Sequence, residues 1–73
     1  MSDKNQYRAN VRLGMEVDIV KKRDQKTGQL TRGIVRSILT SKPFHSRGIK
    51  VMLMTREVGR VQNIVEDNST ENL

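Results

Sequence analysis

Short stretches in which apolar and polar residues alternate are the feature of this sequence that narrows the choice of folds furthest. In the stretch GMEVDIVKK, Met15, Val17 and Ile19 alternate with positions that are mostly charged. A period of two is typical of a β-strand with one buried face, so we predict a first strand at about residues 15–22. No run of ten residues has the spacing of an amphipathic helix. These patterns predict an all-β protein.

Three later segments also have the composition of strands. LTRGIVRSIL, residues 30–39, is rich in branched aliphatics, and its apolar positions change parity between Val35 and Ile38, which predicts a β-bulge. The segment that starts with GIKVML at residue 48 also alternates. One face carries Ile49, Val51 and Leu53, and the opposite face carries Lys50, Met52 and Met54. EVGRVQNIV, residues 57–65, has as its expected buried set Val58, Val61 and Ile64, with a bend at Gly59. We predict a small barrel of four to five short antiparallel strands.

Turn-forming residues separate these strands. RDQKTGQL, residues 23–30, collects Asp, Thr and Gly and is predicted to be a hairpin loop. TSKPFHSRG, residues 40–48, is a second loop because Pro43 lacks a backbone donor and disfavours helix before it. We expect three regions: a flexible N-terminal segment at 1–9, a β-barrel domain at 10–65 and a disordered acidic tail at 66–73.

Length and cysteine content limit the chemistry that the domain can support. A chain of 73 residues forms one domain, and so small a core seldom provides more than about 3–5 kcal/mol of net stability. There are no cysteines and only one histidine, which excludes disulfides and the common zinc patterns. No stretch resembles a signal peptide or a membrane span. We expect a cytoplasmic protein with no metal or other cofactor and no membrane contact.

Charge gives the clearest indication of a partner. Residues 1–65 contain 14 basic and five acidic residues, a net charge of +9, whereas residues 66–73 contain three acids and no base. So dense an excess of positive charge favours polyanions, of which phosphate backbones are the commonest inside cells. A basic composition alone is also compatible with a role in solubility.

Two sets of residues carry a family resemblance. The pattern Gly33-x-Val35-x-x-Ile38, preceded by a basic residue and a strand ending in Val17-x-Ile19, resembles the KOW element of SH3-like barrels in ribosomal and transcription proteins. The stretch GMEVDIVKKRDQKTGQLTRGIVRSILTSKPFHSRGIKV, with VGRVQNI after it, resembles the YwbE-like family of small bacterial proteins over about residues 11–65. The resemblance implies an SH3-like, KOW-like barrel and no assigned chemistry. One departure is LMTRE, where the resemblance leads us to expect more charge and a Gly turn.

Few residues point to catalysis. His45 with Ser41 or Ser46 is the only grouping of a nucleophile and a base. The partners of a catalytic triad meet in space, so short spacing on one loop is weak evidence, and we interpret His45 as a loop residue. We expect Glu16 and Asp18 to share a strand face toward solvent, where they pair with Lys or Arg across the sheet. No phosphate-binding loop of the G-x-x-x-x-G-K-[ST] type is present. We predict that the protein is not an enzyme and has no small-molecule substrate.

The basic residues are expected to form a surface laid over the barrel. If Val35 and Ile38 point inward across a bulge, then the outward positions of neighbouring strands carry arginine and lysine. Adjacent strands lie about 4.8 Å apart, so these side chains can form one basic surface. A second basic group around the first hairpin either extends this surface or keeps an edge soluble. The candidate nucleic-acid-binding residues are Arg32, Arg36, Lys42, Phe44, His45, Arg47, Lys50, Lys21, Lys22, Arg23 and Lys26.

The aromatic content indicates which nucleic acid such a surface suits. Only Tyr7 and Phe44 are aromatic, so base stacking is a minor contribution and contacts to phosphates dominate. Phe44 either plugs the barrel mouth beneath Pro43 or stands exposed beside a ligand. Structured RNA, including ribosomal RNA, suits such a surface better than a DNA operator, because A-form RNA is recognised largely by its shape and backbone. We predict an accessory protein that binds RNA or a ribonucleoprotein.

The alternative is a protein-binding module. Met52 and Met54, if they point outward, form a soft apolar strip for a protein partner or a second copy of the chain. We favour the interpretation that they are ordinary core residues on a twisted strand. Two aromatics cannot line a groove for Pro-rich peptides, so the partner in this alternative is acidic or is the protein itself. We expect a monomer.

Overall fold

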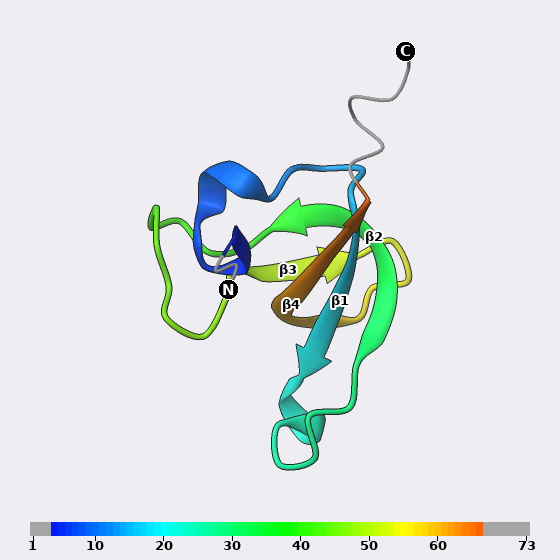
Figure 1. Cartoon of the computed structure of the whole chain (residues 1–73). Coiled ribbons are helices and arrows are strands. Elements are labelled where there is room, and N and C mark those ends of the chain that lie inside the picture. The colour runs from blue at the N-terminus through cyan, green and yellow to red at the C-terminus, as the bar shows by residue number, and fades with distance from the viewer. Residues whose placement is uncertain (1–3, 67–73) are drawn as a thin grey trace.

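Four antiparallel strands close into a barrel in this computed structural model, which describes residues 4–66 (Figure 1). The strands are β1 (Glu16–Lys21), β2 (Thr31–Ile38), β3 (Lys50–Leu53) and β4 (Val58–Glu66), and β4 pairs with β1 to complete the ring. Short 3-10 turns are η1 (Lys4–Gln6), η2 (Arg8–Asn10) and η3 (Lys22–Asp24). No helix among the described residues is long and apolar enough to cross a membrane. The predicted small all-β barrel of SH3-like type is confirmed.

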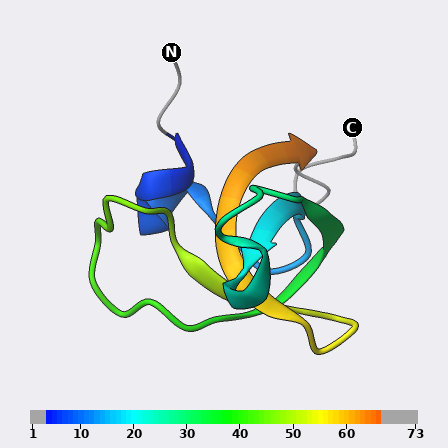
Figure 2. The same cartoon turned by 90° about the horizontal axis from the view of Figure 1, so that it is seen from below.

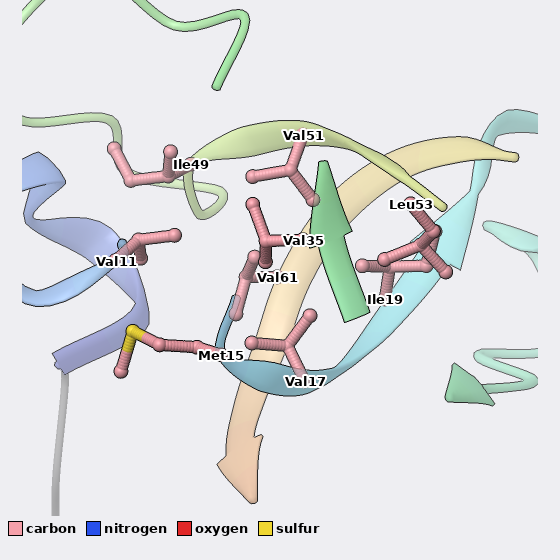
Figure 3. Packing of buried hydrophobic residues seen from close by; sticks show 9 residues of the cluster. All are labelled: Val11, Met15, Val17, Ile19, Val35, Ile49, Val51, Leu53 and Val61. Carbon is pink, nitrogen blue, oxygen red and sulfur yellow. The ribbon is translucent and has the colours of Figure 1, made fainter. Parts of the chain in front are cut away.

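The core lies inside this ring. Nine aliphatic side chains are almost completely buried and point toward one another (Figure 3): Val11, Met15, Val17, Ile19, Val35, Ile49, Val51, Leu53 and Val61. Ile38 and Ile64 are partly buried and pack against them. Burial of one such side chain stabilises the fold by about 1.5–3 kcal/mol, so the alternating residues of all four strands are the main source of stability.

β2 contacts a different neighbour in each of its halves. Its first half pairs with β1, and its second half pairs with β3 after a register shift between Val35 and Ser37. This irregularity confirms the predicted bulge and lets both Val35 and Ile38 face the core. The bent strand is visible in Figure 1, where β2 curves around the barrel.

The turn between β3 and β4 contains the LMTRE departure. The backbone N–H of Leu53 donates to the carbonyl of Glu57 at 2.8 Å, so the hairpin is tight. Arg56 has a φ of +78°, in the left-handed region where glycine is usual. A non-glycine residue there costs about 1–2 kcal/mol, and the turn therefore forms without the glycine at some expense in stability.

The N-terminal segment is attached to the barrel rather than separate from it. We expected residues 1–9 to be flexible, but residues 4–9 form η1 and most of η2 beside the loop that joins β2 to β3 (Figures 1 and 2). Three backbone bonds of 2.9 Å join them: Ile49 N–H to Asn5 O, His45 N–H to Gln6 O and Arg8 N–H to Pro43 O. The Asn5 side-chain amide also donates to the carbonyl of Val61 at 3.0 Å. Apart from Glu66, which ends β4, the predicted tail at 66–73 lies outside the described residues.

Candidate functional site

Two cations stand side by side on the outer face of β3 and β4. The register places Arg60 directly opposite Lys50 on one side and opposite Val20 of β1 on the other. Directly opposed residues have Cβ atoms about 4.5–5.5 Å apart, and like charges at that separation destabilise a sheet. Neither side chain forms an ion pair with a carboxylate of residues 4–66. The register therefore holds two positive charges together without a carboxylate of residues 4–66 to offset their repulsion.

The backbone of Gly48 fixes the direction of Arg60. Arg60 Nη1 donates to the Gly48 carbonyl at 3.1 Å, and the remaining guanidinium N–H groups are left for a ligand. Gly48 is buried with a φ of +105°, and a Cβ at this position would strike the carbonyl of Val61. Only glycine fits this position, because both the dihedral angle and the space exclude a side chain.

Two adjoining hollows lie over these residues. Val20, Gln25, Arg47 and Arg60 line both, so the hollows form one depression, which we call the cationic groove. The smaller lobe, about 430 Å³, adds Lys22 and Lys50 to the two arginines, and we call it the phosphate lobe. The larger lobe, about 540 Å³, is bounded by η1, β4, the loop between β1 and β2 and the loop before β3, and the residues that line it alone are Asn5, Gln6, Gly28, Ser46 and Gln62. Within the part of the chain that the structure describes, no acidic residue lines either lobe.

His45 lies on the loop beside the groove and does not add to its charge. Its Nδ1 accepts a hydrogen bond from the backbone N–H of Arg47 at 3.1 Å. Partial burial and then the positive charges of Arg60, Arg47 and Lys42 lower the pKa of His45 below its usual value. Because the usual value is already about 6.5, the ring is neutral at pH 7. Its role here is to hold the loop that carries Arg47.

Arg32 is withdrawn from the predicted surface by an ion pair. Asp18 is only 5% exposed, so our expectation that it faces solvent is wrong, although the expected pairing across the sheet is present. Arg32 Nε donates to Asp18 Oδ1 at 2.8 Å and Arg32 Nη2 donates to Oδ2 at 3.3 Å. Asn63 Nδ2 donates to the same Oδ2 at 3.4 Å. The cluster joins β1, β2 and β4, and its first role is structural.

This cluster predicts a specific dependence of stability on pH. The hydrogen bonds from Arg32 lower the pKa of Asp18 against the opposing effect of burial, and the bond from Asn63 lowers it further. The pair thus stabilises the fold fully above the unfolded-state pKa of about 4, and this contribution is lost as pH falls through the folded-state value. Arg32→Met should be less stable than the natural chain at neutral pH. The difference between the urea midpoints of the two proteins should narrow below about pH 4.

Urea unfolding followed by circular dichroism at a series of pH values measures this gap. Arg36→Met is the matched control, because Arg36 is an exposed cation of the same strand without an ion pair among the described residues. The difference in urea midpoint between Arg36→Met and the natural chain should not change with pH over the same range. An Arg32→Met gap that stays constant down to pH 2 would show that Asp18 does not depend on Arg32.

The other predicted site residues divide into two groups. The structure brings Lys22, Arg47 and Lys50 together in the groove, with Lys42 and His45 on the adjacent loop. Lys21 is paired with Glu57 at 2.8 Å, while the remaining predicted cations line neither lobe: Arg23, Lys26, Arg32 and Arg36. Of the predicted site residues, the structure thus gathers three cations around one depression and places the others outside its lining.

Arg60 is the residue that sequence reasoning missed. We expected Val58 to be buried, but Val58 is half-buried and lines the phosphate lobe, while Gly59 and Val61 take the inward positions. Reading the inward parity from Gly59 instead of Val58 would have placed Arg60 on the outer face of the strand, although its position opposite Lys50 depends on the register. The glycine hid the alternation because it has no apolar side chain to mark an inward position.

The side chains whose position the sequence left open are all partly or largely exposed. Phe44 is 44% exposed, and its ring lies 5.1 Å from that of Tyr7 at a tilt of 56°. It thus neither plugs the barrel nor lines the groove, but anchors η2 to the loop. Met52 is half-buried, whereas Met54 is 61% exposed, so the core interpretation of Met54 is wrong.

Comparisons with known proteins give the same family as the sequence motifs. A family model described as "Uncharacterized conserved protein (DUF2196)" matches residues 4–64. The chain is 55% identical over 60 residues to "Uncharacterized protein YwbE" of Bacillus subtilis (strain 168), a match that covers 82% of this chain and 92% of that protein. No solved structure was found to match. The resemblance to YwbE-like proteins is confirmed.

Proposed function

The chain belongs to the DUF2196 family, and from that premise we propose that it is a non-catalytic accessory protein that binds RNA phosphates in its cationic groove. The description of the family names no activity, so the proposal rests on the surface of the barrel. The observation that carries it is the unpaired juxtaposition of Arg60 and Lys50, with Arg47 and Lys22 in the same lobe and no acid beside them. The opposition of Arg60 and Lys50 costs the sheet stability, and a polyanionic partner accounts for this pair and for the two further cations beside it.

RNA is a better partner than a DNA operator for two physical reasons. Among residues 4–66 there is no α-helix that could enter a major groove. Arginine and lysine that contact phosphates give affinity with little discrimination between sequences, and RNA is recognised largely through its backbone and the shapes of its loops. The proposal includes ribosomal RNA and ribonucleoprotein particles as partners, in a cytoplasmic setting.

The test is RNA binding measured as a function of salt. Fluorescence anisotropy with a structured RNA should give an affinity that falls steeply as salt is raised, because bound phosphates release counterions. Arg60→Gln, Arg47→Gln and Lys50→Gln should each weaken binding and reduce the slope of log affinity against log salt by about 0.7–0.9. Lys26→Gln and Arg36→Gln are matched controls, because these exposed cations lie outside the groove. Equal losses of RNA affinity in the groove variants and in the control variants would refute the groove as the binding site. RNA binding that salt does not weaken would do the same.

A protein partner is the second candidate, favoured by one observation. Met54 and Leu13, at 61% and 58%, are the most exposed of the large apolar side chains that the structure describes, and such side chains are available to a protein partner. Affinity capture from cells with and without nuclease separates the two functions. A partner that survives nuclease and is lost in Met54→Gln supports the protein-binding function, whereas a partner lost with nuclease supports RNA.

A further inference from the structure

The larger lobe of the groove differs in chemistry from the phosphate lobe. Its distinctive side chains are the amides of Asn5, Gln6 and Gln62. Each amide nitrogen donates to a backbone carbonyl: Asn5 Nδ2 to Val61 at 3.0 Å, Gln6 Nε2 to Ser46 at 2.7 Å and Gln62 Nε2 to Arg47 at 3.3 Å. We call this part of the groove the amide lobe.

These bonds determine which atoms remain for a ligand. A carboxamide carries two N–H donors and one oxygen that accepts up to two hydrogen bonds. Because at least one N–H of each amide donates to the backbone, each amide is held with a defined orientation, and no described residue donates to the three side-chain oxygens. The lobe therefore offers fixed acceptors from three amides together with guanidinium donors from Arg47 and Arg60.

A nucleobase is the kind of group that matches such a set. The edges of bases carry donors and acceptors side by side, and carboxamides and guanidiniums are the side chains that pair with them most directly. The volume of about 540 Å³ lies in the range of pockets that hold small organic groups. The phosphate lobe adjoins this lobe on one side and supplies positive charge there. A base can therefore lie in the larger lobe while its phosphate lies in the phosphate lobe.

We propose that the amide lobe receives one unpaired base of a single-stranded RNA segment while the adjacent phosphates lie in the phosphate lobe. This inference rests on the proposed function and specifies its ligand. Base pairing occupies the Watson–Crick edge in a duplex, and stacking holds the base inside the helix, so a duplex presents only phosphates to the groove. Recognition of the base here relies on hydrogen bonds, since neither aromatic ring of the chain lines the lobe.

The experiment compares a single-stranded RNA of about ten nucleotides with the duplex of the same sequence, by anisotropy at fixed salt. The natural chain should bind the single strand at least about tenfold more tightly per site, as expected when several hydrogen bonds to a base are added. Gln62→Met should reduce single-strand affinity about five- to tenfold with the salt slope unchanged, and it should leave duplex affinity as it was. Lys50→Gln should instead reduce the salt slope for both RNAs.

A second readout does not depend on one substitution. In ¹H–¹⁵N spectra the side-chain NH₂ signals of Asn5, Gln6 and Gln62 should shift on addition of the single strand and stay in place with the duplex. Thermal unfolding of Gln62→Met serves as the control that this variant is folded. Equal affinity for both RNAs with a Lys50-dependent salt slope would overturn this inference and leave the proposed function standing. Absence of binding to either RNA would overturn both.

Discussion

Substituting alanine for Gly59 is expected to remove a large share of the stability of the fold. At this position β4 approaches β1 so closely that a Cβ would lie 2.5 Å from the carbonyl oxygen of Val20 and 3.0 Å from Ile19 Cδ1. The oxygen belongs to the backbone of a paired strand and cannot turn aside, so the pairing that completes the ring must open. Overpacking of this kind costs about 1–3 kcal/mol or more, against about 3–5 kcal/mol available to so small a domain.

Urea unfolding by circular dichroism, with one-dimensional NMR as a check on folding, measures this effect. Gly28→Asn is the matched control: Gly28 has a φ of +75°, which asparagine tolerates, and a Cβ there has nothing within 4 Å. The control should unfold within about 1 kcal/mol of the natural chain. A Gly59→Ala protein with the same midpoint as the control would show that the strands separate there without cost.

Removal of residues 1–9 is expected to destabilise the barrel almost as severely. The deletion takes away the carbonyls that accept hydrogen bonds from Ile49 and His45, and it exposes Val11, now only 1% exposed. An unsatisfied buried donor costs about 1–3 kcal/mol, and loss of cover over an aliphatic side chain adds to that. The shortened chain should therefore populate the unfolded state substantially, as measured by its urea midpoint.

Asn5→Ala separates the contribution of the side chain from that of the backbone. It removes only the amide bond to Val61 and keeps the backbone carbonyl that accepts from Ile49. We expect a loss of about 1 kcal/mol, clearly smaller than that of the deletion. If the deletion and the point variant are equally mild, the N-terminal turns do not support the barrel, and the original expectation of a flexible segment holds.

The inward faces of β1, β2 and β3 could be predicted because a period of two is a local property. Ile49, Val51 and Leu53 are buried as their alternation indicates, and even the bulge in β2 left a trace in the parity change from Val35 to Ile38. A side chain of the right size at each alternate position suffices for such a prediction. In β4 this condition fails at Gly59, and the inward face of that strand was predicted wrongly at Val58.

The N-terminal turns and the cation pairing depend on partners that are distant in sequence. Residues 4–9 join the fold mostly through backbone groups, which every residue carries, so their composition has no pattern to reveal it. Arg32 looks like any surface cation until the register of β1 and β2 sets it opposite Asp18. Arg60 likewise becomes a groove residue only when β4 is aligned with β3. Strand register, and not residue type, decides which charges are free.

Closure of the ring also limits how this protein can recognise anything. Each of the four described strands has a neighbouring strand on both sides of the ring, although β2 and β4 pair with a given neighbour over only part of their length. Little of the sheet edge in residues 4–66 is therefore open to a peptide that would add as a further strand, or to the sheet of another molecule. We expect partners to be bound mainly by side chains that project from the outer wall, where a change in binding specificity can evolve without disturbing the backbone pairing that maintains the barrel.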